Sequence, residues 1–289
     1  MNTVINPSTM SERRIDRVVR GLATSDGAGV TLTRVIGQPA LEMLDPFLML
    51  DAFGSNDPND YIAGFPPHPH RGFETVTYLL AGRMRHQDSV GNEGVIEPGG
   101  VQWMTAGRGV IHSEMPEQEN GLLQGFQLWV NLPAAHKMDP AAYQEFTPDE
   151  VPLEIRADGA TVRVIAGETA QGTRGPVNQP LTRPSYFDIT LTAQASLLEP
   201  LPLGHNAFVY LSDGAAVIDG QRLTPGELAI LTPSQHAVRV TAQAQGARLL
   251  LIAGKPLGEP VVKSGPFVMN TREQIQQAFD DYRQGKLTA

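Results

Sequence analysis

The 289-residue chain contains no cysteine. Disulfides, thiolate nucleophiles and cysteine-based zinc or iron–sulfur sites are therefore excluded, and the absence fits a reducing compartment. Hydrophobic runs are also short, because none approaches the roughly 20 residues that a membrane-spanning helix needs. Residues 1–19 lack the apolar centre of a signal peptide. These absences predict a soluble, cytoplasmic protein with no membrane partner.

Positive charge is scarce as well. The chain has 22 Lys and Arg residues against 31 Asp and Glu residues, which gives a net charge of −9. A surface this acidic repels phosphate backbones, so direct nucleic-acid binding is not expected. The densest basic stretch holds Arg13, Arg14, Arg17 and Arg20, but apolar residues alternate with them. This pattern favours a strand with one solvated face over a binding patch.

The sequence also lacks several catalytic motifs. It has no G-x-S-x-G elbow, no Walker loop and no G-x-G-x-x-G that opens a helix. Ser113 lies between His112 and Glu114, so on a strand its side chain points away from both. A serine nucleophile at this position is therefore not expected.

Glycine and proline are abundant, with 29 and 23 residues. Both interrupt helices and mark turns, so they predict many short antiparallel strands, as in a jelly roll. One helix is predicted in the tail, with Asn270 as its cap, Glu273 completing a capping box and Gly285 as its end. Its apolar stripe, which includes Ile275 and Tyr282, is expected to dock on the barrel that precedes it.

Two halves of the chain share a pattern. In each half a Pro-Gly turn leads a strand towards a histidine, from Pro98-Gly99 to His112 and from Pro225-Gly226 to His236. A proline-rich connection, residues 133–152, separates the halves. We therefore predict an all-β protein of two tandem barrels, residues 1–145 and 146–289, with the helix in the second. Two barrels could cover each other's apolar faces, so a monomer is expected.

The chemistry-bearing residues gather in the first half. His68 and His70 are two residues apart, as are His112 and Glu114, so each pair shares one strand face. Glu74 shares the face of the first pair if no bulge intervenes. Two such pairs on neighbouring strands would bring three imidazoles and a carboxylate together. This donor set suits Fe(II), Mn, Co, Ni or Cu and leaves coordination positions open for catalysis.

Paired histidines also occur on ordinary strands, so the interpretation depends on both pairs together. Gly107 and Gly109, just before the second pair, allow a sharp bend beside the ligands. His86 lies in a charged strand and is expected to face solvent. In the second half His205 and His236 stand singly, so the second barrel is expected to hold no metal.

Three blocks carry a family resemblance that covers nearly the whole chain: HPHRGFETVTYLLAG, VQWMTAGRGVIHSEMP and SGPFVMNTREQIQQAFDDY. They resemble the pirin family of the cupin superfamily. The resemblance implies a bicupin fold, with iron or another divalent metal bound by His68, His70, His112 and Glu114. The usual cupin pattern would instead take its carboxylate from Glu74, which we expect behind the ligands or in the barrel wall.

The resemblance also implies two functions. Several pirin-like proteins are quercetin 2,3-dioxygenases, which open the flavonol ring with dioxygen and release carbon monoxide. In that case Glu114 is the expected base, and Phe73, Trp103 and Met115 are expected to line the substrate pocket. Other members are iron-containing, redox-sensing co-regulators that bind a protein partner without turnover. A purely structural bicupin is a third reading, against which the intact ligand set argues.

An open, aromatic-lined cavity above the metal would favour the enzyme. A sealed metal beside a charged surface patch would favour the regulator.

Overall fold

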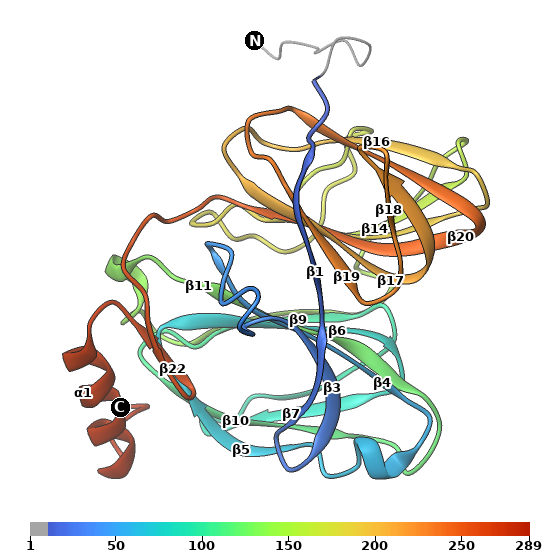
Figure 1. The fold of residues 1–289 in the computed structure, drawn as a ribbon. Helices are drawn as coiled ribbons and strands as arrows, with labels where there is room; N and C mark the ends of the chain where they lie inside the picture. Colours follow the sequence, from blue (N-terminus) through green and yellow to red (C-terminus); the bar gives the residue numbers. More distant parts are fainter. Residues whose placement is uncertain (1–10) are drawn as a thin grey trace. The chain divides into compact units, whose positions relative to one another are not determined.

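The computed structural model describes residues 11–289, so the expectation about a signal peptide falls largely outside the described residues. The chain forms two compact β-rich units (Figure 1). We call residues 22–151 and 257–289 the first barrel, and residues 11–21 and 152–256 the second barrel. Among residues 11–289, no helix combines the length and the apolar character that crossing a bilayer requires.

The first barrel is a sandwich of two antiparallel sheets. Its elements are β2 (Leu22–Asp26), β3 (Val30–Ile36), β4 (Phe47–Ser55), η2 (Pro58–Asp60), β5 (Phe65–His70), β6 (Phe73–Ala81), β7 (Met84–Asp88), β8 (Glu93–Ile96), β9 (Val101–Thr105), β10 (Val110–Pro116), β11 (Leu123–Asn131), η3 (Ala134–His136), β12 (Ala142–Phe146), β21 (Val262–Ser264), β22 (Phe267–Met269) and α1 (Arg272–Arg283). The smaller sheet has the order β5-β10-β7-β8, and the larger has β12-β9-β6-β11-β4-β3-β2.

The second barrel is built on two long strands that bend around its core. Its strands are β1 (Ile15–Arg20), β13 (Leu153–Ile155), β14 (Ala160–Ala166), β15 (Ser185–Leu191), β16 (Ser196–Pro200), β17 (Asn206–Ile218), β18 (Gln221–Leu223), β19 (Glu227–Leu231) and β20 (Ala237–Gly254). The main path runs β1-β19-β17-β20-β15-β14-β13. The two barrels confirm the predicted all-β bicupin fold with a C-terminal helix.

The two interiors differ in how apolar side chains fill them. In the second barrel one continuous cluster of buried Ala, Val, Leu, Ile and Phe side chains occupies the centre. The first barrel contains several smaller clusters of buried apolar residues. Close packing of apolar side chains normally leaves few voids. In the first barrel buried polar side chains, among them His112 and Glu114, and a cavity accompany the apolar packing.

The ends of the chain correct the predicted domain boundaries. Residues 11–21 belong to the second barrel, because β1 pairs with the edge strand β19. Helix α1 belongs to the first barrel, where Ile275 and Ala278 bury against Phe267 and Met269. The predicted linker also contains β12, which pairs with β9 of the first barrel. In each case an unpaired strand edge or apolar stripe is covered by a distant segment.

Helix α1 begins one residue later than predicted. Thr271, not Asn270, is the N-cap, and it forms a capping box with Gln274 in place of Glu273. Thr271 is the cap because its hydroxyl accepts a hydrogen bond from the backbone N–H of Gln274. The side-chain oxygen of Gln274 in turn accepts from the backbone N–H of Thr271. Gly285, with φ of 67°, follows the last helical turn as predicted.

The arginine-rich segment is solvated on one face, with one exception. Arg14, Arg17 and Arg20 are exposed, but Arg13 is buried. Its guanidinium donates to the backbone carbonyls of His205, Pro202 and Gln235. Arg13 therefore fixes the start of the chain to the second barrel rather than facing solvent.

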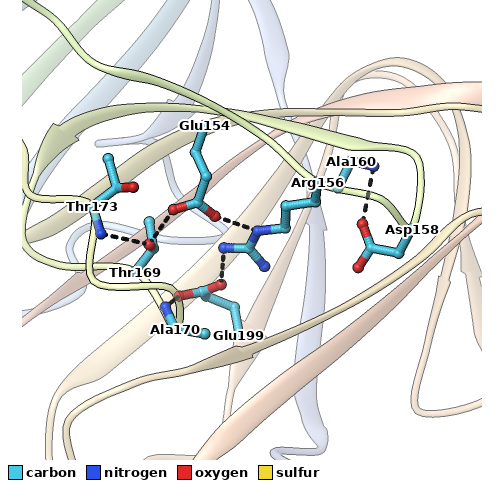
Figure 2. A network of polar contacts seen from close by, with 8 residues as sticks. All are labelled: Glu154, Arg156, Asp158, Ala160, Thr169, Ala170, Thr173 and Glu199. Atoms are coloured by element: carbon cyan, nitrogen blue, oxygen red, sulfur yellow. Dashed lines mark hydrogen bonds and ion pairs between the residues drawn. The ribbon is translucent and has the colours of Figure 1, made fainter.

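A buried ion network stabilises the second barrel (Figure 2). Arg156 pairs with Glu154 and with Glu199, whose carboxylate is 2.7 Å from the guanidinium. Glu199 also accepts from the Ala170 amide at 2.7 Å, and Glu154 accepts from Thr169. Burial raises the pKa of Glu199, and the Arg156 charge opposes that shift. The network joins β13 and β16 to the loop that contains Thr169.

Replacing Arg156 should destabilise the second barrel strongly. Arg156→Met leaves two buried carboxylates without a cation, and breaking a buried pair in this way costs about 3–5 kcal/mol. Urea unfolding measures the difference. The matched control is Arg174→Met, which removes an exposed ion pair to Glu168 and should cost at most about 1 kcal/mol. Equal effects of the two substitutions would contradict this account.

Candidate metal centre and its cavity

Three histidines converge inside the first barrel. His68 and His70 lie on β5, and His112 lies on β10 directly opposite His68 in the antiparallel register. One nitrogen atom from each ring lies within 4.8 Å of the others. The ring centroids of His68 and His112 are 4.5 Å apart. The strand pairing thus brings together the three imidazoles that the sequence singled out.

Backbone carbonyls orient two of the rings. His68 Nδ1 is 2.9 Å from the carbonyl oxygen of Pro66, and His70 Nδ1 is 3.4 Å from that of Pro266. A carbonyl oxygen only accepts, so each Nδ1 carries the proton and donates it. The Nε2 lone pairs then remain available, which is the arrangement that metal-binding histidines usually adopt.

His112 supplies the observation that tests the fit of a metal. Both of its ring nitrogens are buried, and neither has a hydrogen-bond partner among residues 11–289. Leaving a buried polar group unpaired costs about 1–3 kcal/mol. Burial, followed by the neighbouring imidazoles, holds the pKa of His112 well below its usual value. Burial has the same effect on the pKa of His70. Neutral imidazoles are the form that binds a metal, so these residues fit one.

Glu114 lies beside the histidines and is held at both oxygens. It is buried on β10, two residues after His112. Its Oε1 accepts from Thr77 Oγ1 at 2.6 Å, and its Oε2 accepts from Gln127 Nε2 at 3.0 Å. The carboxylate is not part of the 4.8 Å grouping of the histidines. Each oxygen keeps a further lone pair with which it could reach a metal.

Sequence reasoning missed Thr77 and Gln127. They lie on β6 and β11 of the larger sheet, whereas Glu114 belongs to the smaller sheet. Nothing in the local sequence around either residue marks it, because the contact exists only where the two sheets face each other. Such partners orient a metal-binding carboxylate and are part of the site.

Glu74 lies apart from the histidine grouping. It is fully buried on β6, where it accepts a hydrogen bond from Thr105 at 2.7 Å. The condition for a shared face fails because the chain turns at Gly72, with φ of 90°, between β5 and β6. Glu74 therefore belongs to the larger sheet rather than to the strand of His68 and His70.

The prediction that His86 faces solvent is wrong. His86 is 3% exposed, because the alternation of β7 turns Met84, His86 and Asp88 inward. Its Nε2 is 2.5 Å from a carboxylate oxygen of Glu145. The charged residues next to His86 in the sequence suggested an exposed strand. In the structure one face of β7 is polar and points into the barrel interior.

A cavity of about 650 Å³ opens beside His68, His70 and Glu114. Its aromatic lining comes from Phe53, Phe65 and Trp129, so the prediction that Phe73, Trp103 and Met115 line it is wrong. Phe73 and Trp103 are core residues, 0% and 1% exposed. Phe73 packs against the lining residue Trp129, and the centroids of the two rings are 4.3 Å apart.

The C-terminal tail holds the turns next to the ligands. Arg71, which follows His70, is buried and forms an ion pair of 2.6 Å with Asp281 of α1. It also donates to the carbonyl oxygen of Leu287. A Cβ at Gly109 would lie 2.2 Å from that same oxygen, which explains a glycine there. The tail therefore packs on the segments that precede and follow the ligands.

Two tandem barrels with a three-histidine cluster in the first define a bicupin protein with a candidate metal centre. A family model described as Pirin matches residues 29–130, and one described as Pirin C-terminal cupin domain matches residues 186–288. Human pirin is 42% identical over 96% of this chain and 94% of its own. The chain therefore belongs to the pirin family.

Two further relatives carry the name of an enzyme. A Pseudomonas aeruginosa protein, whose name gives quercetin 2,3-dioxygenase as a provisional activity, is 53% identical over 92% of this chain and 95% of its own. A crystal structure of quercetin 2,3-dioxygenase from Acinetobacter baumannii is similar with a TM-score of 0.89 and 34% identity. That similarity covers 96% of this chain and 99% of the other.

The contacts of Glu114 lead to a prediction about metal affinity. Thr77→Val and Gln127→Leu should each weaken metal binding by about 10–100-fold, because they release the carboxylate that they orient. Competition with a chromogenic chelator measures the affinity. His236→Ala, in the second barrel, is the control and should leave it unchanged. Unaltered affinity in both Thr77→Val and Gln127→Leu would show that Glu114 needs no such support.

Proposed function

We propose that this protein is a metal-dependent dioxygenase that opens the central ring of quercetin or a related flavonol. The observation that carries the proposal is the open cavity of about 650 Å³ that reaches His68, His70 and Glu114. A regulator whose metal is sealed from solvent would not need such a space. Ligand sites are typically concave, apolar and of this size.

The metal ligands we propose are His68, His70, His112 and Glu114. Three neutral nitrogen donors and one carboxylate suit a divalent first-row metal, and we propose Fe(II), with Ni, Co, Mn or Cu as alternatives. When bound there, such a metal would act as a Lewis acid for the flavonol oxygens and support the reaction with dioxygen. Both oxygen atoms of dioxygen enter the product, and one ring carbon leaves as carbon monoxide.

Glu114 is the proposed base. The flavonol 3-hydroxyl must lose a proton before the ring is electron-rich enough to react with dioxygen, and a carboxylate at the cavity wall accepts it. Thr77 and Gln127 hold that carboxylate in position through their hydrogen bonds. Phe53, Phe65 and Trp129 provide flat apolar surface against which the fused rings of a flavonol can stack.

The names of two relatives support the same reaction. The Pseudomonas aeruginosa relative and the Acinetobacter baumannii structure are both named for quercetin 2,3-dioxygenase activity. The cytoplasm remains the proposed location, since the chain has no cysteine and its acidic surface suits a soluble protein.

Dioxygen uptake with quercetin tests the proposal. The apo-protein is loaded separately with Fe(II), Ni, Co, Mn and Cu, and metal content is determined on the same samples. We expect uptake that tracks metal content, with release of carbon monoxide. His68→Ala and Glu114→Ala should lose both metal and uptake, because each removes a ligand. His236→Ala should retain both.

Full metal occupancy without uptake for any of the five metals would contradict the proposed activity. The metal-sensing, partner-binding function would then become the better explanation of the same site.

A further inference from the structure

Charged side chains line the same cavity as His68 and His70. Arg34 on β3 donates two hydrogen bonds to Asp51 on β4, at 2.9 and 2.7 Å. It donates a third to Asp26, at 2.6 Å. The side chain of Asp51 is 3% exposed and that of Asp26 is 51% exposed. Asp51 is therefore the inner end of this group, and Asp26 lies at the mouth of the cavity.

Lys263 brings a second cation to the same cavity. It lies on β21 and is exposed, and its Nζ is 5.0 Å from the centroid of the Trp129 ring. Within residues 11–289, no carboxylate oxygen lies within 4.0 Å of that Nζ, which distinguishes Lys263 from Arg34. The Trp129 ring also contacts His70, with the centroids 5.3 Å apart. The Trp129 ring therefore lies between the Lys263 ammonium, which has no carboxylate partner, and His70 of the candidate metal centre.

Charge balance decides what this end of the cavity would accept. Asp26 and Asp51 carry two negative charges, Arg34 and Lys263 carry two positive charges, and all four side chains line the cavity. A ligand carboxylate would add an unbalanced negative charge beside Asp26. An apolar group would remove water from Lys263 and Asp26 without replacing their hydrogen bonds. A phenolic hydroxyl both accepts and donates, and it adds no charge.

We propose that Lys263 and Asp26 form a subsite for a hydroxyl group on an outer ring of the substrate. Lys263 donates to the hydroxyl oxygen, and Asp26 accepts its proton. The inference rests on the proposed function, and it narrows the substrate class to flavonols that carry ring hydroxyls beyond the 3-hydroxyl. Lys263 and Asp26 act as specificity-determining residues, whereas Arg34 and Asp51 position Asp26.

Binding measured without dioxygen tests this inference separately from turnover. The metal-loaded protein is titrated by calorimetry, under exclusion of dioxygen, with quercetin and with 3-hydroxyflavone, which lacks the outer hydroxyls. We expect tighter binding of quercetin. Lys263→Met should weaken quercetin binding about tenfold or more, as for the loss of a hydrogen bond to a charged group. It should leave 3-hydroxyflavone binding unchanged.

Two further variants sharpen the test. Asp26→Ala should weaken the binding of quercetin and leave the binding of 3-hydroxyflavone unchanged. In this variant Arg34 keeps both of its hydrogen bonds to Asp51. Lys255→Met makes the same substitution at an exposed lysine of the second barrel and should affect neither ligand.

Equal weakening of both ligands by Lys263→Met would overturn the subsite, because it would indicate a general loss of cavity structure. Equal affinity of the unaltered protein for quercetin and 3-hydroxyflavone would also overturn it. Selective weakening without dioxygen uptake would support the subsite and refute the dioxygenase. Absence of binding by either flavonol would refute both.

Discussion

The antiparallel pairing of β5 with β10 is the constraint on which the site depends. That register sets His112 opposite His68, and the alternation of each strand then turns His70 and Glu114 to the same interior. A slip by one residue would turn every one of these side chains to the other face. Contacts at the ends of the two strands hold β5 and β10 in this register. Arg71 ties the end of β5 to α1, and Gly109 lets the C-terminal tail approach the start of β10.

The two barrels show how one architecture can be used in two ways. The second barrel is filled by a continuous apolar core, and its buried Arg156 is paired with Glu154 and Glu199. The interior of the first barrel also contains imidazole, carboxylate and amide side chains between its sheets. His112, with both nitrogens unpartnered by the described residues, is the clearest sign that this interior is built to hold something else.

The end of the chain contributes to the first barrel at three levels. Helix α1 covers an apolar surface, Pro266 accepts the hydrogen bond that orients His70, and Lys263 reaches the cavity mouth. The contact between His70 and Pro266 joins residues that are 196 positions apart in the sequence. A single segment therefore supports the candidate ligands and shapes the space in which a substrate would bind.

Much of this protein could be predicted from its sequence, because local rules determine it. Turn residues and alternation predict an all-β fold, the H-x-H and H-x-E spacings identify the interior-facing pairs, and Gly285 ends the helix. Only the tertiary structure shows that α1 packs on the first barrel, that His86 is buried and that Thr77 and Gln127 hold Glu114. These facts arise from contacts between sheets and between distant segments, and no local pattern encodes which surfaces will meet.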